Sequence, residues 1–239
     1  MLADALADEH PFVRWCAGLT LAQADRPQAR SVLLDALEEG TPEKQAAAAD
    51  ALIWVRQADA GPLLQALASP EALVRQSAAE ALGRLRYRAA VPQLISLLTD
   101  ESPWVRHAAV RALGLIGDTQ AVTPLVQCLK DSSPWVRRSA AYALGAMRIM
   151  QAVPHLLAAL DDSDVHVRRN AAWALGRIGD AAALPRLRIL QASTALDREV
   201  AREVEAAIDA IQRPAWRRLP GAVRKWWGAR LGIINGKID

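Results

Sequence analysis

Few of the residues that build reactive or cross-linked sites are present in this chain. Among 239 residues there are two cysteines, one phenylalanine, two tyrosines and four histidines. Cys16 and Cys128 lie far apart and outside any CxxC or CxxH spacing, which argues against a zinc site or a disulfide framework. We therefore expect reduced thiols, no structural metal and a cytoplasmic location.

Long apolar segments are absent as well. No run of about 18 apolar residues occurs, and the segment from Met1 does not combine a basic region with an apolar stretch. We expect neither an export signal nor a membrane-spanning helix. Alternating runs of β-branched residues are rare, whereas Ala, Leu and Arg are abundant, so the composition indicates an all-α protein.

Catalytic motifs are missing too. The chain contains neither a Gly-rich phosphate loop nor a Gly-x-Ser-x-Gly turn, and no converging set of nucleophile, base or metal ligands is apparent. The sequence thus predicts no catalytic residues, no metal ligands and no cofactor.

A repeat of 31 residues organises most of the chain. Val-Arg pairs begin at positions 13, 74, 105, 136 and 167, and the two clearest copies read Ser-Pro-Trp-Val-Arg from Ser102 and from Ser133. The first spacing is 61 residues, and it contains a degenerate copy from Thr41, in which Lys44-Gln45 stands where Val-Arg is expected. Internal repetition of this kind is the signature of a solenoid.

Each unit predicts a helical hairpin. In the fifth unit, Gly145 falls before the end of the first helix, which indicates close packing against a neighbour. A hairpin of this size cannot bury its apolar side alone, so about six of them should stack into one core. The second helix of a unit starts near a proline, at Val91-Pro92, Thr123-Pro124, Val153-Pro154 and Leu184-Pro185. The apolar face of the fifth unit's first helix consists of Val136, Ala140, Ala143, Leu144 and Met147.

The Val-Arg pair followed by Ala-Ala-x-Ala-Leu-Gly resembles the HEAT-like repeats named after phycobilisome lyases, over roughly residues 10–190. This resemblance implies an α-solenoid of about six HEAT-like hairpins with the Val-Arg helices on its concave side. No histidine is followed by Glu, so the His-Glu pairs of di-iron HEAT-like hydroxylases are missing. The resemblance also implies that Arg106, Arg137 and Arg168 pair with acids in the turn before each, namely Asp100, Asp131 and Asp162.

Two regions follow from the pattern: a solenoid over residues 1–212 and a basic, Trp-rich tail over residues 213–239. Val200, Val204, Ala207 and Ile211 define a helix that caps the solenoid. The tail holds seven Lys or Arg and one Asp, which leaves a net charge of −3 on residues 1–212 although the whole chain carries +3. A basic helix with tryptophans can lie on an anionic membrane, enter a partner's groove or fold back as a second cap. Its candidate binding residues are Trp216, Arg217, Arg218, Arg224, Lys225, Trp226 and Trp227.

The outward positions of the Val-Arg helices form a stripe whose character changes along the chain. They lie one residue before Val and two, six and ten residues after it, which keeps them on one helical face. The first three units place apolar and acidic residues there, including Trp15, Asp50 and Glu80. The last three units place aromatic and basic residues, which we predict to bind a partner: Trp104, His107, Arg111, Trp135, Arg138, Tyr142, His166, Arg169, Trp173 and Arg177.

Three functions remain open at this point. Clustered Tyr, Trp and Arg favour a non-enzymatic scaffold for an acidic protein partner, although Trp104 and Trp135 can also serve as apolar fillers of the seam between units. The lyase resemblance implies a role in tetrapyrrole attachment, because an Arg-aromatic groove suits a propionate-bearing pigment. HEAT-like DNA glycosylases imply nucleic acid, with Asp50 and Glu80 as available carboxylates. The net acidity of residues 1–212 disfavours a duplex binder.

Overall fold

The structure is a computed structural model that describes residues 2–24, 27–55, 60–193 and 197–213. Within these ranges the chain forms helices and no strands, so the prediction of an all-α protein is confirmed. None of the helices in the described ranges is long and apolar enough to cross a bilayer. The tail from residue 214, with its candidate binding residues, lies outside them, and its three interpretations stay predictions.

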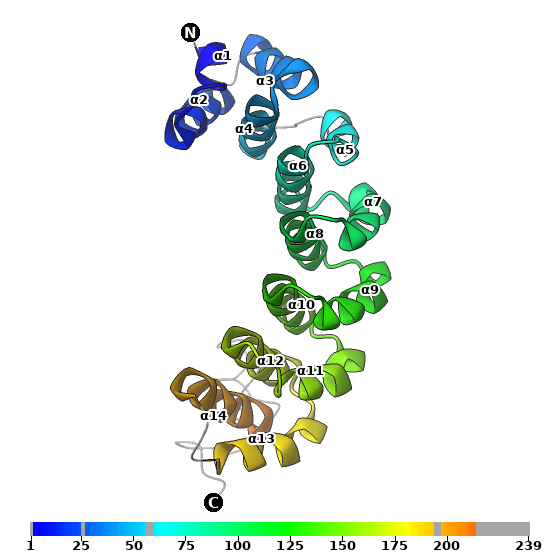
Figure 1. Ribbon diagram of the computed structural model, residues 1–239. Coiled ribbons are helices and arrows are strands. Elements are labelled where there is room, and N and C mark those ends of the chain that lie inside the picture. The colour runs from blue at the N-terminus through cyan, green and yellow to red at the C-terminus, as the bar shows by residue number, and fades with distance from the viewer. Residues whose placement is uncertain (1, 25–26, 56–59, 194–196, 214–239) are drawn as a thin grey trace, which may run out of the picture.

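Six helical hairpins and one further helix stack into an arc (Figure 1). The first helices of the hairpins line the inner, concave side, and each packs against the next one along the stack. The inner helices are α2 (Pro11–Gln23), α4 (Pro42–Leu52), α6 (Ala72–Arg84), α8 (Pro103–Ile116), α10 (Pro134–Ala146), α12 (Val165–Ile178) and α14 (Arg198–Gln212). The α-solenoid of HEAT-like hairpins is therefore confirmed, including the degenerate unit at α4.

Shorter helices form the outer row of the arc. In α7, α9, α11 and α13 a proline lies within the first three residues, as the sequence predicts, and short 3-10 turns precede these helices. The outer helices are α3 (Pro27–Glu39), α5 (Gly61–Ala66), α7 (Val91–Ser96), α9 (Val122–Gln127), α11 (Val153–Ala159) and α13 (Leu184–Gln191), and α1 (Leu2–Ala5) precedes the first hairpin.

The predicted apolar face of α10 packs as expected. Val136, Ala140 and Leu144 are fully buried, and Pro134 occupies the first helical position, where its missing N–H costs nothing. The side chain of Ser133 makes no capping hydrogen bond. The Ser133 amide instead donates to Asp131 Oδ1 over 2.8 Å, so the acid stabilises the turn that leads into the helix.

Glycine allows neighbouring inner helices to approach closely. A Cβ added at Gly145 would lie 2.6 Å from both Cα and Cβ of Ala174, closer than real Cβ atoms come. The same contact recurs along the stack, between Gly83 and Ala112, Gly114 and Ala143, and Gly176 and Ala207. The predicted role of Gly145 in close packing is thus confirmed and extends to the Gly of each Ala-Leu-Gly motif from α6 to α12.

An arginine in each of three inner helices ties consecutive turns together. Arg106 Nε and Nη2 donate to the two carboxylate oxygens of Asp131, both over 2.8 Å, while its Nη1 donates to the main-chain oxygen of Asp100. Equivalent bidentate pairs join Arg75 to Asp100 and Arg137 to Asp162.

The prediction that each arginine pairs with the acid of the preceding turn is therefore wrong. Arg106 and Arg137 reach the carboxylate of the following turn and only the main-chain oxygen of the preceding one. The reason is local: Asp131 accepts the Ser133 amide, which turns its carboxylate away from Arg137 and toward the previous unit. Arg168 donates only to the main-chain oxygens of Asp162 and Ser163.

These pairs set the charge state of their acids. Desolvation favours the neutral form of Asp131, but the Arg106 hydrogen bonds, the Ser133 amide and the nearby positive charges outweigh it. The pKa of Asp131 therefore lies below its ordinary value, and the pKa values of Asp100 and Asp162 are lowered in the same way.

The row of pairs is interrupted at the degenerate unit. Gln45 stands where the arginine is expected and donates to the Leu37 main-chain oxygen over 2.9 Å. Gln45 and Ser69 line a cavity of about 480 Å³ between this hairpin and the next. Gln45 therefore pairs with a main-chain oxygen instead of a carboxylate, and it borders this cavity.

The predicted capping helix is present as α14, with Val200, Val204, Ala207 and Ile211 buried. Because α14 packs against α12 as well as α13, it occupies the place of a seventh inner helix and closes the core at this end. Cys16 and Cys128 are free thiols, and burial raises the pKa of Cys128 to about 12, which keeps it protonated.

Candidate functional site on the concave side

Aromatic and basic side chains of α10 and α12 meet in one stack. The rings of Tyr142 and Trp173 lie parallel, with centroids 4.7 Å apart and an interplanar angle of 9°. The Arg177 guanidinium lies 5.7 Å from the Trp173 ring centroid, close enough for a cation–π contact. Residues 31 positions apart in the sequence are thus direct neighbours, as a stack of equal repeats requires.

A second aromatic pair joins α8 to α10. The centroids of Trp104 and Trp135 are 6.2 Å apart, and the Arg138 guanidinium lies 5.7 Å from the Trp135 ring. Trp104 and Trp135 are 53% and 49% exposed. Each indole therefore covers the seam between two units with one side and presents the rest of its surface to solvent.

His107 of α8 makes contacts within the protein. His107 Nδ1 lies 3.2 Å from the Trp135 main-chain oxygen and 2.9 Å from Ser139 Oγ, so the ring bridges α8 and α10. Burial lowers the pKa of His107, the Trp135 carbonyl opposes this and the charge of Arg111 adds to it. The imidazole is consequently neutral at physiological pH. Arg111 and His166 are exposed on the same side of the arc.

The last arginine-bearing unit connects to α14. Arg169 Nη1 pairs with Glu199 Oε2 over 2.8 Å, so this guanidinium is partly engaged within the protein. Glu199 stands one residue before Val200 and thus continues the stripe into α14. Sequence reasoning did not include it, although aligning this helix on Val200 reveals the position.

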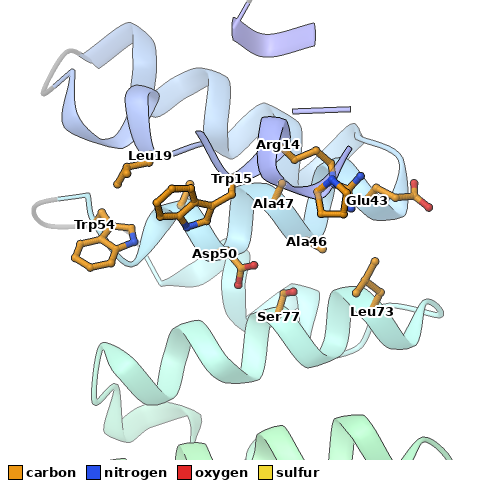
Figure 2. Close-up of a pocket in the computed structure, with 12 residues that line it drawn as sticks. Arg14, Trp15, Leu19, Glu43, Ala46, Ala47, Asp50, Trp54, Leu73 and Ser77 are labelled. Carbon is orange, nitrogen blue, oxygen red and sulfur yellow. The ribbon is translucent and has the colours of Figure 1, made fainter. Parts of the chain in front are cut away.

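At the other end of the arc, the stripe borders a cavity of about 150 Å³ between α2, α4 and α6. Figure 2 shows Trp15, Trp54 and Asp50 around it, with Asp50 projecting from α4 toward α6. Asp50 is exposed to solvent on one side, but desolvation by the residues packed around it raises its pKa to about 6, helped by the charge of Glu80 and opposed by Arg84. The sequence placed these residues in the stripe and named Asp50 only as an available carboxylate for the nucleic-acid alternative, without grouping the three as a site. The available signal is the four-residue spacing between Asp50 in α4 and Trp54 in the turn that follows it.

The described part of the groove offers no site for a metal ion, because no three His, Cys, Asp or Glu side chains gather there. Its chemistry consists of exposed indoles, guanidinium groups and single carboxylates. Such groups can bind other molecules through charge, stacking and apolar contact.

Comparison with known proteins supports the repeat architecture. The family profile described as HEAT repeats matches residues 60–145 and 122–209. None of the curated proteins matches the chain. A solved structure of the Escherichia coli protein YibA shares 20% identity over 89% of this chain and 92% of its own, with a TM-score of 0.65.

Two further solved structures have the same fold. The complex of CpcE and CpcF of phycocyanin lyase from Nostoc sp. is 24% identical over 88% of this chain and 93% of that one, with a TM-score of 0.53. A designed armadillo repeat protein in complex with the peptide (KR)4 is 22% identical over 88% and 98%, with a TM-score of 0.52. At these identities the likeness shows the fold alone.

Proposed function

The chain belongs to the family of HEAT-repeat proteins, and we propose that it is a non-enzymatic scaffold that holds an acidic segment of a protein partner against α8, α10 and α12. Stacked repeats create an extended concave surface on which equivalent side chains recur at a fixed spacing. The designed armadillo protein that shares this fold was solved with the basic peptide (KR)4, which supports a peptide segment as the type of ligand but not its acidic charge.

The observation that carries the proposal is the exposed cation–aromatic surface of α10 and α12. Arg138 and Arg177 each lie over an indole, and neither forms an ion pair with an acid among the described residues. A guanidinium held over a ring keeps its N–H donors available for a carboxylate, and Arg binds planar carboxylates through two parallel hydrogen bonds. Tyr142, 54% exposed, adds a flat apolar surface between them.

The spacing of the inner helices suits an extended peptide. Packed helices lie about 8–10 Å apart, and an extended chain advances about 3.3–3.6 Å per residue. Every third residue or so of the partner would therefore meet the next inner helix. An acidic segment of about eight residues would cover the three helices that carry the aromatic and basic stripe.

Binding of a fluorescent octapeptide of alternating Asp and Glu tests this proposal. The double substitution Arg138→Glu and Arg177→Glu should lower the affinity at least tenfold, because two positive contacts become repulsive, while helicity stays unchanged. Arg169→Glu is a poorer choice, since it would place a carboxylate against Glu199 and disturb the contact between α12 and α14.

The matched control changes the same net charge on the outer row. Lys130 and Arg188 are exposed there, and the double substitution to Glu should leave the affinity within about twofold at moderate salt. An equal loss of affinity in both double variants would show that only net charge matters. Unchanged affinity in the Arg138 and Arg177 double variant would contradict the proposal. Visible tetrapyrrole absorbance or copurifying nucleic acid in the native protein would favour the other two functions.

A further inference from the structure

The cavity at the N-terminal end of the groove differs in chemistry from the aromatic and basic stripe. Trp15 and Trp54 line it and are 52% and 55% exposed, so about half of each side chain is open to solvent. Asp50 lies between these aromatic side chains and the facing helix α6 (Figure 2). A carboxylate beside two exposed indoles matches the needs of an organic cation, because tryptophan is the best cation–π partner and the acid supplies the opposite charge.

The described residues leave this carboxylate without an ion pair. Among the residues that the structure describes, Asp50 accepts no side-chain hydrogen bond and forms no ion pair. Arg14 also lines the cavity, but its Nη1 donates to the main-chain oxygens of Asp8 and Glu9 over 2.8 and 3.0 Å. Arg84 affects Asp50 only through its charge. The Asp50 carboxylate is thus exposed at the cavity and has no ion-pair partner among the described residues.

The size of the cavity limits the ligand. About 150 Å³ is the size of an engineered protein cavity that binds benzene, and it is below the 300 Å³ or more of typical cofactor pockets. A tetrapyrrole does not fit such a space, whereas one long amino-acid side chain does. The open side of the cavity faces the groove, where the backbone of a partner peptide would run.

We propose that this cavity binds one Lys or Arg side chain of a partner, with the cationic group over Trp15 and Trp54 and its charge paired with Asp50. The site is independent of the acidic-segment contacts of α8, α10 and α12. The inference rests on the proposed scaffold function. The cavity and the acidic-segment contacts together give the groove two oppositely charged ends. The bound segment then has a fixed direction, with its basic residue at α4 and its acidic residues toward α12.

The distance between the two regions follows from the stack. Three steps between inner helices separate α4 from α10, which corresponds to roughly 24–30 Å at 8–10 Å per step. An extended peptide spans that distance with about eight residues. The partner segment should therefore carry its basic and acidic groups about that far apart.

Two labelled octapeptides separate this inference from the proposed function. One alternates Lys and Arg and reports on the cavity, and the other alternates Asp and Glu and reports on the basic stripe. Asp50→Asn should weaken binding of the basic peptide about tenfold or more and leave the acidic peptide unaffected. Trp54→Ala should weaken the basic peptide several-fold. Glu205→Gln removes one exposed carboxylate on α14 and is the matched control, with no more than a twofold effect on the basic peptide.

A pH titration adds an independent readout. Among the described residues, the charged groups around Asp50 are Arg14 of α2, Glu43 of α4, and Glu80 and Arg84 of α6. Affinity of the basic peptide should fall as the pH is lowered through about 6, where Asp50 becomes protonated, and this step should be absent in Asp50→Asn. If Asp50→Asn binds the basic peptide as the wild type does, or if Glu205→Gln weakens it equally, the cavity is not the site. If the wild type binds the basic peptide but not the acidic peptide, the acidic-segment contacts of the proposed function are contradicted. This inference then stands, because it needs only a peptide bound in the groove.

Discussion

The Gly-Ala contacts between inner helices allow a quantitative test of how tightly the solenoid is stacked. A Cβ added at Gly114 would lie 2.7 Å from the Cβ and 3.3 Å from the Cα of Ala143. Gly114→Ala gains about 1 kcal/mol of helix propensity, but overpacking a rigid contact costs about 1–3 kcal/mol. Since the helices must separate to relieve the contact, we expect the upper end of that cost and a net loss of about 2 kcal/mol in the free energy of unfolding.

The double variant Gly114→Ala with Ala143→Gly gives a more specific test of this prediction. Ala143→Gly alone should cost about 1 kcal/mol, because it introduces glycine into a helix interior. In the double variant the close Cβ–Cβ contact is gone and the remaining 3.3 Å contact needs only a small shift, so its stability should approach that of the wild type. The coupling energy is then about 2–3 kcal/mol, well above the few tenths expected of independent sites.

Gly145 and Ala174 provide the contrasting case. There the added Cβ would lie 2.6 Å from the Ala174 Cα as well as from its Cβ. Removing the Ala174 Cβ leaves the contact with the backbone, so Ala174→Gly should not rescue Gly145→Ala. Urea denaturation followed by circular dichroism measures all six variants. Rescue at both positions, or a gain in stability from either Gly→Ala change, would refute this account of the stacking.

Three further predictions concern stability. Leu144→Ala should cost about 2–5 kcal/mol in urea denaturation, because Leu144 is fully buried; a cost well under 1 kcal/mol would mean that the apolar face is wrong. Arg148→Gly should raise stability by about 1 kcal/mol, since Arg148, two residues past the end of α10, has a φ of 55° and Gly179 fills the equivalent position one unit later; unchanged or lower stability would contradict this. The pKa of Asp131 is lowered on folding, so its ion pair with Arg106 stabilises the protein above the unfolded Asp pKa of about 4, and this stabilisation is lost as the pH falls through the lower folded value. In an acid titration of stability, Asp131→Asn should therefore lose part of the acid sensitivity. A titration identical to that of the wild type would argue against the pair.

The architecture could be predicted from the sequence because each repeat packs against its neighbours through the same positions. Ala, Leu and Gly recur at fixed positions, so the inner helices, their buried face and the close contact at Gly145 were all predictable. The partner of Arg106 was not, because it depends on how the Asp131 carboxylate turns when it accepts the Ser133 amide, which spacing alone does not reveal.

In the groove, too, some features could be predicted from the sequence and others could not. Periodicity placed Tyr142 and Trp173 next to each other, since their positions are one unit apart. It did not show that Arg169 is engaged by Glu199, because α14 departs from the 31-residue spacing. It also did not separate the cavity at Asp50 from the rest of the stripe, since a cavity depends on side-chain volumes from three helices at once.

Binding of bipolar peptides tests most directly the claim that the concave groove holds an extended segment by its charges. The probe is a peptide with a Lys-Arg block and an Asp-Glu block joined by a spacer of about eight residues, which matches roughly 24–30 Å between the two regions. We predict that it binds at least tenfold more tightly than either block alone, because both contacts form at once. A two-residue spacer, Asp50→Asn, or the Arg138 and Arg177 double substitution should each abolish this advantage. Equal affinity for the long and short spacers, or no gain over the tighter block, would contradict the account.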